Sequence, residues 1–393
     1  MAKYIFPDYT RSIVNMMASI RRHFGLEITH NTLKELDEEL NKNYKNIIIV
    51  LLDGMGSKII ENSIGNDNFF TKHKKCDYMS IFPPTTVAAT TALLSTKTPI
   101  ENGWLGWHEY IKEIDCDITM FRSTGYYDES IKFDYNVANK YMPYLSIVDE
   151  LKTVGITSGD VYPAFREGGA KDFDEFLAQI KAFINKDDSR KFAYCYWEQP
   201  DHDLHDFGCT SEEVKKQITT LNDKMEEFFN KEIDDDTLII VTADHGHIDI
   251  VDTNLAGYPN VLKYLKRLPS IEPRAATFFV KEGMEEAAHF CSLCTSCGRC
   301  NEVCPVNISL KDLFLENRKD LVKENKSLIS ERNFLSFLFK KMNSRKNLDK
   351  YGSAFKDIEL SFQVKKKWGS KRELPKFAKE SFSQYWKNIN KLN

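Results

Sequence analysis

Five residues combine carboxylate oxygens with imidazole nitrogens at spacings that suit metal binding: Asp53, Asp201, His205, Asp244 and His245. This mixture favours zinc or manganese over calcium. Asp201 and His205 are four residues apart, so one helical turn would place both on one face. Asp244 and His245 would diverge on a strand, but from a loop both can reach neighbouring metals. Two cations a few ångströms apart stabilise the attacking and leaving oxygens of a phosphoryl transfer, so residues of this kind could support the hydrolysis of a phosphoester.

A threonine-rich run could supply the nucleophile for this chemistry. The sequence Phe-Pro-Pro-Thr-Thr at 82–86 leads into the mostly small residues of 87–94. The prolines favour an extended entry, and the small residues predict a helix whose N-terminus favours a phosphate. A metal-bound threonine hydroxyl loses its proton easily and can form a covalent phospho-intermediate.

Strands and helices must bring these groups together. Residues 46–52 are too apolar for a half-exposed strand, so they predict a central strand of a parallel sheet. Three further strands and two helices are expected, over 192–197, 237–242 and 277–280 and over 173–185 and 212–230. Ligands of open α/β sheets bind beyond the carboxyl ends of the strands. The polar residues should therefore converge at one edge of a central, mostly parallel sheet flanked by helices, in an α/β fold.

Four motifs, in this order, resemble the type I phosphodiesterase and nucleotide pyrophosphatase branch of the alkaline phosphatase superfamily: IVLLDG at 49–54, FPPTT at 82–86, DHDLH at 201–205 and TADHG at 242–246. The resemblance extends from about residue 45 to 285. It implies an alkaline phosphatase-like fold and a phosphodiesterase, nucleotide pyrophosphatase or phosphatase activity. The substrate it implies is a small phosphorylated molecule of nucleotide type.

The same resemblance implies roles for the site residues. Thr86 would be the nucleophile, and Thr85 is the alternative. Two divalent ions, zinc or manganese, would be held by two sets of residues: Asp53, Thr86, Asp244 and His245 for one, and Asp201, His205 and a later histidine for the other.

The later histidine is where this chain departs from the family pattern. In the family it lies well downstream, in a loop of the His-Gly-Gly kind. Only His247 and His289 follow His245 here, and neither lies in such a loop. The second metal is therefore expected to lack one ligand. His202, next to Asp201, is interpreted as a surface or core residue.

The cysteines predict a second kind of site. Four of the nine follow the spacing C-x-x-C-x-x-C-x-x-x-C-P of bacterial [4Fe–4S] proteins: Cys294, Cys297, Cys300 and Cys304. In two-cluster ferredoxins the fourth cysteine of such a run binds the other cluster. If this chain holds a single cluster, Cys304 or Cys291 would have to be its fourth ligand. Zinc binding and free thiols are the alternatives, although zinc sites more often use two separated C-x-x-C pairs.

The segment from about 290 to 390 resembles the C-terminal end of the iron–sulfur protein of the lactate utilisation system. It carries the cysteine run and the motif RELPKFA at 372–378. We therefore expect a truncated hydrolase domain over 1–285, joined to a smaller, mainly helical, cysteine-rich segment over 286–393. That segment could serve a redox partner.

Composition restricts the remaining possibilities. The net charge of −4 gives no indication of nucleic acid binding. The N-terminus lacks the apolar core of a signal peptide, and no apolar run approaches the length of a membrane span, so a cytoplasmic protein without membrane contact is expected. Aromatic residues could stack on a nucleotide base or belong to the core, and four are candidates: Trp104, Trp107, Tyr126 and Tyr127.

The sequence is compatible with three functions. The first is metal-dependent phosphoester hydrolysis through a threonine nucleophile. The second is electron transfer by an iron–sulfur protein related to lactate utilisation. The third is an inactive fusion of the two parts.

Overall fold

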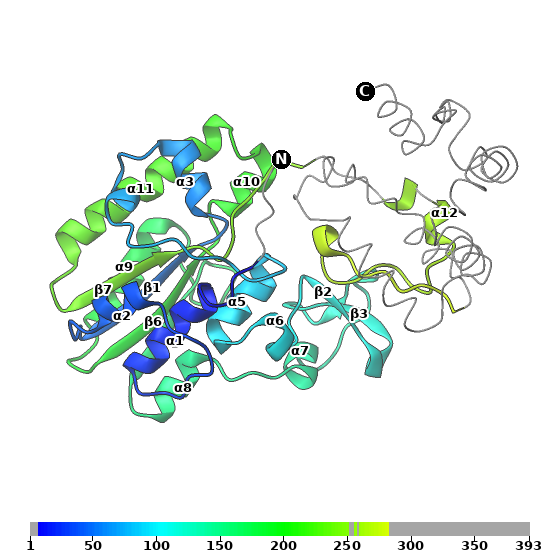
Figure 1. The fold of residues 1–393 in the computed structure, drawn as a ribbon, viewed down its shortest axis with the longest axis horizontal. Helices are drawn as coiled ribbons and strands as arrows, with labels where there is room; N and C mark the ends of the chain where they lie inside the picture. Colours follow the sequence, from blue (N-terminus) through cyan, green and yellow to red (C-terminus); the bar gives the residue numbers. More distant parts are fainter. Residues whose placement is uncertain (1–6, 251–254, 258, 283–393) are drawn as a thin grey trace, which may run out of the picture. The chain divides into compact units, whose positions relative to one another are not determined.

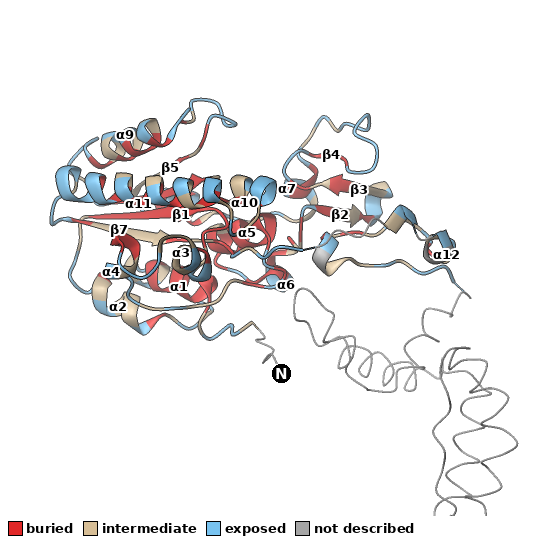
Figure 2. Cartoon of the chain, turned by 90° about the horizontal axis from the view of Figure 1, so that it is seen from above, coloured by how far each residue is buried: buried red, intermediate tan, exposed pale blue. Residues whose placement is uncertain are grey.

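The most apolar run of the sequence forms the central strand. In the computed structural model, which describes residues 7–250, 255–257 and 259–282 (Figure 1), β1 spans Asn46–Leu52 and is buried along its whole length. A strand buried on both faces needs a covering layer on each side. Figure 2 shows β1 buried behind helices whose outer faces are exposed.

Four parallel strands make up the main sheet. β6 (Lys191–Trp197) and β7 (Thr237–Thr242) lie on either side of β1, and β5 (Thr157–Val161) pairs with β6. The strand order is β5-β6-β1-β7. The predicted α/β fold with a central parallel sheet is confirmed, as are the strands predicted over 46–52, 192–197 and 237–242.

Successive residues of β1 point into two separate cores. Ile48, Val50 and Leu52 pack into one hydrophobic cluster, and Ile47, Ile49 and Leu51 pack into the other. The first face is covered by α3 (Ser57–Ile64), α4 (Phe69–Lys72), α9 (Phe173–Ile184), α10 (Asp201–Phe207) and α11 (Glu212–Glu232). The second face is covered by α1 (Ile13–His23), α2 (Lys34–Leu40), α5 (Thr86–Ser95) and α8 (Ile147–Thr153). Both helices predicted between the strands are present, as α9 and α11.

A smaller antiparallel sheet lies between α6 (Pro99–Asn102) and α7 (Val137–Tyr141) in the sequence. Its strands are β2 (His108–Ile111), β3 (Cys116–Thr119) and β4 (Thr124–Gly125), and η1 (Lys112–Ile114) joins the first two. A third core, which includes Trp104, Ile118 and Val137, packs under it. The remaining described elements are short: η2 (Leu255–Gly257), α12 (Pro259–Leu262) and η3 (Pro273–Ala275).

The prediction of a sheet strand over 277–280 is wrong. Thr277 pairs antiparallel with Ser270, and Val280 pairs with Leu265, both as isolated bridges outside the parallel sheet. Phe278 is 48% exposed, which does not suit an inner strand. The fourth strand of the sheet is instead β5, whose sequence TSGDV has little apolar character because it lies at the sheet edge.

The predicted cysteine-rich part lies outside the described residues. This applies to Cys294, Cys297, Cys300 and Cys304 and to the whole segment 286–393. Within the part of the chain that the structure does describe, none of the helices has both the length and the apolar character needed to cross a membrane.

Candidate active site

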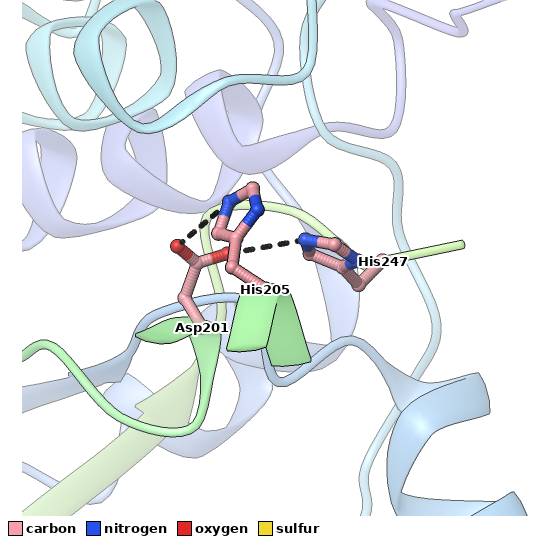
Figure 3. A group of neighbouring side chains, drawn as sticks. All are labelled: Asp201, His205 and His247. Carbon is pink, nitrogen blue, oxygen red and sulfur yellow. Dashed lines mark ion pairs between the residues drawn. The ribbon is translucent and has the colours of Figure 1, made fainter. Parts of the chain in front are cut away.

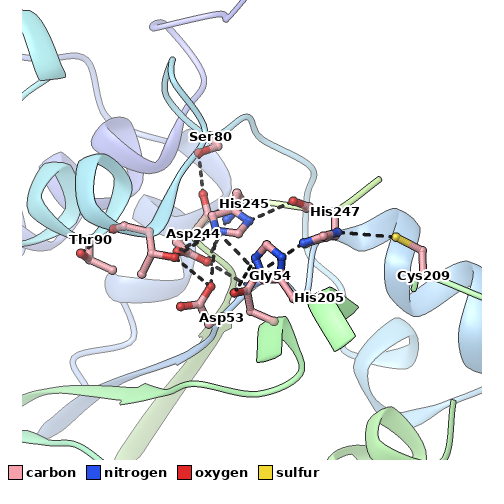
Figure 4. Close-up of polar contacts among 12 residues, drawn as sticks. Asp53, Gly54, Ser80, Thr90, His205, Cys209, Asp244, His245 and His247 are labelled. Atoms are coloured by element: carbon pink, nitrogen blue, oxygen red, sulfur yellow. Dashed lines mark hydrogen bonds and ion pairs between the residues drawn. The ribbon is translucent and has the colours of Figure 1, made fainter. Parts of the chain in front are cut away.

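Three aspartates meet at the carboxyl edge of the main sheet, and Figure 4 labels two of them, Asp53 and Asp244. Asp53 directly follows β1, Asp201 begins α10 after β6, and Asp244 follows β7. Backbone hydrogen bonds join the first two loops, since the Asp53 N–H donates to the Trp197 carbonyl at 2.9 Å and the Asp201 N–H donates to the Asp53 carbonyl at 3.0 Å. The convergence follows from the parallel order, because neighbouring strands end at the same edge.

Asp53, Asp244 and His245 form one group of possible metal ligands. One ligand atom from each lies within 4.8 Å of the others, and all three residues are buried. His245 Nε2 lies 3.4 Å from Asp53 Oδ1 and 3.5 Å from Asp244 Oδ2. The other Asp244 oxygen, Oδ1, accepts hydrogen bonds from the backbone N–H groups of Gly54 at 3.1 Å and of His245 at 2.9 Å. Asp244 is thus fixed in place by the loop that it belongs to and by the loop after β1.

The ring orientation of His245 suits metal binding. Its Nδ1 lies 2.9 Å from the Gly246 carbonyl oxygen, which can only accept. Nδ1 therefore carries the hydrogen, and in a neutral ring the lone pair is on Nε2, which faces the two carboxylates. A backbone carbonyl that holds the outer nitrogen is a common support for a metal-bound histidine.

Thr86 lies directly beside this group. It is the first residue of α5, and its hydroxyl lies 3.4 Å from Asp53 Oδ1 and 3.2 Å from His245 Nε2. Thr85 precedes it as the N-cap residue of the helix. The predicted helix after the proline pair is confirmed. The backbone N–H groups of its first turn make this end of the helix a favourable place for an anion.

Burial and mutual repulsion disfavour the ionised forms of these aspartates when no cation is bound. Burial raises the pKa of Asp53 well above its ordinary value, and the neighbouring Asp244 and Asp201 carboxylates raise it further. The Tyr196 hydroxyl opposes this by donating a hydrogen bond to Asp53 Oδ2. Among the described residues, His245 is the only ion-pair partner of Asp53 and Asp244. A bound divalent ion would offset this charge, so the donor set fits one.

Asp201 and His205 belong to a second group, as expected, but its third member is His247 (Figure 3). Ligand atoms of these three residues lie within 4.8 Å of one another. His205 Nε2 lies 3.5 Å from Asp201 Oδ2, which confirms that one turn of α10 places both on one face. Sequence reasoning did not assign His247. The available signal was its position two residues after His245, in the motif Asp-His-Gly-His.

The two groups adjoin each other. His245 Nε2 lies 4.0 Å from Asp201 Oδ1, and His247 Nε2 lies 3.9 Å from the same oxygen. Asp201 therefore lies between the two histidines of the Asp-His-Gly-His motif. This geometry suits a pair of closely spaced cations, with a hydroxyl nucleophile at the more buried one.

The four aromatic candidates have different environments. Trp104 is a core residue whose indole N–H donates to the Met142 carbonyl at 2.9 Å. Tyr126 stacks on His108 with ring centroids 3.6 Å apart. Trp107 and Tyr127 are 42% and 49% exposed, so these two remain candidates for a base-stacking surface.

Comparisons with known proteins agree with the order of motifs. The family model described as type I phosphodiesterase / nucleotide pyrophosphatase matches residues 47–267. No curated protein sequence matches the chain.

Among solved structures, two of murine ectonucleotide pyrophosphatase/phosphodiesterase 5 are similar. One is an inactive variant in complex with AMP, with a TM-score of 0.48, 16% identity, and 62% of this chain and 68% of that chain covered. The other has a TM-score of 0.47 and 17% identity, with the same coverage. The human protein gives a TM-score of 0.45 and 16% identity, with 61% and 67% covered. The family match contains all six predicted residues of the hydrolase site and spans more than half of the sequence, and the chain therefore belongs to the type I phosphodiesterase / nucleotide pyrophosphatase family.

Proposed function

We propose that this chain hydrolyses phosphoesters with Thr86 as the nucleophile and two divalent ions, zinc or manganese, as cofactors. One observation carries the proposal: the Thr86 hydroxyl lies at the N-terminus of α5, within 3.4 Å of Asp53 Oδ1 and 3.2 Å of His245 Nε2. A threonine in the helix interior or on the surface would have no such partners. Asp53, Asp244 and His245 would hold one ion beside the hydroxyl, and Asp201 and His205 would contribute to the other.

The chemistry follows from these positions. When bound, the two cations would neutralise the phosphoryl oxygens and lower the pKa of the threonine hydroxyl. Thr86 Oγ1 attacks phosphorus, the bond from phosphorus to the leaving oxygen breaks, and the leaving oxygen ends with the proton that the hydroxyl gave up. Water then attacks the phosphothreonine, which restores the hydroxyl and releases the second product. The N–H groups at the start of α5 favour the anionic phosphoryl group through both steps.

The substrate class that we propose is a small phosphodiester or nucleotide pyrophosphate. The family description names both kinds of substrate. The exposed rings of Trp107 and Tyr127 offer apolar area for a planar leaving group.

The cysteine run lies outside the described residues and would be a separate site. We propose that Cys294, Cys297, Cys300 and Cys304 bind a [4Fe–4S] cluster, because their spacing is that of bacterial cluster proteins. In this proposal the hydrolase domain ends near residue 285 and does not need the cluster for hydrolysis.

Substitution of Thr86 tests the hydrolytic function. Thr86→Ala should lower phosphodiester turnover by about 10³-fold or more, because the nucleophile is lost. Zinc content should stay at the wild-type level, since carboxylates and imidazoles remain. Thr86→Ser should keep part of the activity. Thr85→Ala is the matched control and should change turnover by only a few-fold. Equal losses in both alanine variants, or full activity of Thr86→Ala, would contradict the assignment.

A further inference from the structure

We propose that His247 is the third protein ligand of the second metal site and that Cys209 holds its ring in position. The proposal rests on the two-metal function above, and it assigns a ligand that the family pattern supplies from a downstream loop. With His247 in that role, residues of the described part of the chain complete both metal sites.

The position of the His247 ring is the first argument. Its Nε2 lies 3.9 Å from Asp201 Oδ1, and its ring meets the His205 ring edge to face with centroids 4.5 Å apart. Figure 3 shows the two rings and the carboxylate around one common space. These residues come from different elements, α10 and the loop after β7, so their approach is a product of the fold and not of sequence spacing.

The contacts on the far side of the ring are the second argument. His247 Nδ1 lies 3.7 Å from the Cys209 sulfur (Figure 4), while Nε2 faces Asp201 (Figure 3). An outer partner that holds one ring nitrogen fixes the orientation in which the other can bind a metal. Cys209 is thus a positioning residue, because it touches the histidine and not the proposed ion.

A backbone anchor holds Cys209 and the His247 loop together. The Cys209 N–H donates to Asp249 Oδ1 at 2.8 Å, so the residue next to the sulfur is tied to the chain two positions beyond His247. Gly208 permits this contact. Its φ is +84°, and a Cβ there would lie 3.2 Å from Asp249 Oδ1. The segment after α10 and the segment after β7 are therefore held at a fixed separation around the ring.

The donor set also matches the proposed ion. One carboxylate and two imidazoles, with a further position left for water or substrate, form a common arrangement at catalytic zinc. Asp201 and His247 are partly buried, and His205 is exposed, so the site lies at the solvent side of the more buried first group. A substrate could reach the second ion without passing the first.

Zinc binding by the full chain tests the proposal. Apo protein is titrated with zinc against a chromophoric chelator, and bound zinc is counted by elemental analysis after dialysis. The wild type should bind at least two ions, because thiolates of the cysteine run can also take up zinc. His247→Ala should bind one ion fewer than the wild type or bind that ion more than about 100-fold more weakly, and Cys209→Ala should weaken the same ion about 10-fold without removing it. His202→Ala, an exposed histidine on α10, is the matched control and should bind as the wild type.

The possible outcomes are separable. The wild-type zinc content and affinity in His247→Ala, an equal loss in His202→Ala, or fewer than two ions in the wild type would overturn the proposal. If the alanine variant does not fold, His247→Asp keeps a ligand oxygen and should restore the second ion, and its failure to do so in a folded protein counts against the assignment. The measured quantity is bound zinc and not turnover. A chain that binds both ions without hydrolysing phosphodiesters would therefore contradict the proposed function but support the assignment of His247 as a ligand.

Discussion

Asp53 shows how single residues support the candidate site. Its carboxylate is buried beside two other aspartates, so hydrogen bonds or positive charge must stabilise its ionised form. Part of this comes from Tyr196, which donates a hydrogen bond to Oδ2 and leaves Oδ1 facing Thr86 and His245. Burial and the nearby Asp53 carboxylate raise the pKa of the Tyr196 hydroxyl far above its ordinary value, so this group is a donor at neutral pH.

We therefore expect Tyr196→Phe to weaken metal binding. The loss of the hydroxyl removes the group that orients Asp53, and such outer partners typically contribute 10- to 100-fold in metal affinity. Chelator competition with zinc would measure the change. The control is Tyr194→Phe, on the same strand. The Tyr194 hydroxyl is fully buried and has no hydrogen-bond partner among the described residues, so this variant should bind zinc as the wild type does. Equal weakening in both variants would assign the effect to packing.

The elements position the site through loops that approach unusually closely. Gly54 has a φ of +70°, and a Cβ there would lie 2.9 Å from the Asp201 Cβ. A Cβ on Gly56 would lie 2.9 Å from the Gly246 Cα. The loop after β1 therefore touches the start of α10 on one side and the loop after β7 on the other, and only glycine leaves room for both.

Gly54→Ala is expected to disturb the second metal group as well as the backbone. The positive φ of Gly54 costs alanine about 1–2 kcal/mol, and the added methyl pushes against Asp201. Gly25→Ala is the control, because Gly25 follows α1 with a φ of +75° and nothing lies within 4 Å of an added Cβ there. Both variants should lose unfolding free energy to backbone strain. Only the Gly54 variant should lose zinc from the second site, and normal zinc binding in that variant would show that the contact is not needed.

Glu109, on β2, is expected to make the free energy of unfolding depend on pH. The side chain is buried and accepts a hydrogen bond from the Leu105 N–H, and burial raises its pKa to about 7. A raised pKa means that the folded state favours the neutral form. The neutral Glu109 side chain contributes fully to the free energy of unfolding below its ordinary pKa near 4.5. This contribution is lost as the pH rises through about 7. The loss is on the order of 3 kcal/mol at most.

Glu109→Gln should remove this pH dependence. The amide oxygen can still accept from Leu105 but cannot ionise, so the variant should match the wild type at pH 5 and be more stable at pH 8. Urea unfolding at both pH values, with metal removed by a chelator, measures the difference. Glu113→Gln, at an exposed position, serves as the control. A variant that is equally destabilised at both pH values would show that the hydrogen bond matters more than the charge.

At the scale of the whole molecule, all residues of the proposed hydrolase site lie between Asp53 and His247. Both groups of candidate ligands and the proposed nucleophile lie within the family match of 47–267. The cysteine run begins beyond that match. Hydrolysis and iron binding are therefore expected to be independent properties of one chain.

Cys297→Ala in the full chain tests this independence. Protein purified without oxygen should lose its iron and visible absorbance on this substitution, because the motif loses one of its thiolate ligands. Zinc content and phosphodiester turnover should not change. A wild-type chain without iron would remove the cluster from the proposal, and a parallel loss of turnover would show that the two parts are coupled.

The sequence by itself determined the central elements and most of the candidate ligands. The run at 46–52 is apolar on both faces, which predicts a buried parallel strand, and strand ends in such sheets gather polar residues. The pair Asp201 and His205 could be placed on one face because helical periodicity is a local property. The order of motifs was sufficient to predict the family.

Only the tertiary structure decided which histidine joins Asp201 and His205. His247 reaches them because the segment after α10 and the segment after β7 are held together by contacts such as that of Cys209 with Asp249, and no sequence spacing encodes a distance between two such segments. The same reason explains the edge strand β5 and the segment 277–280, since pairing depends on which strand edge is available and not only on apolar pattern. Local periodicity is set by the backbone, whereas the geometry of a site is set by packing between elements that are distant in sequence.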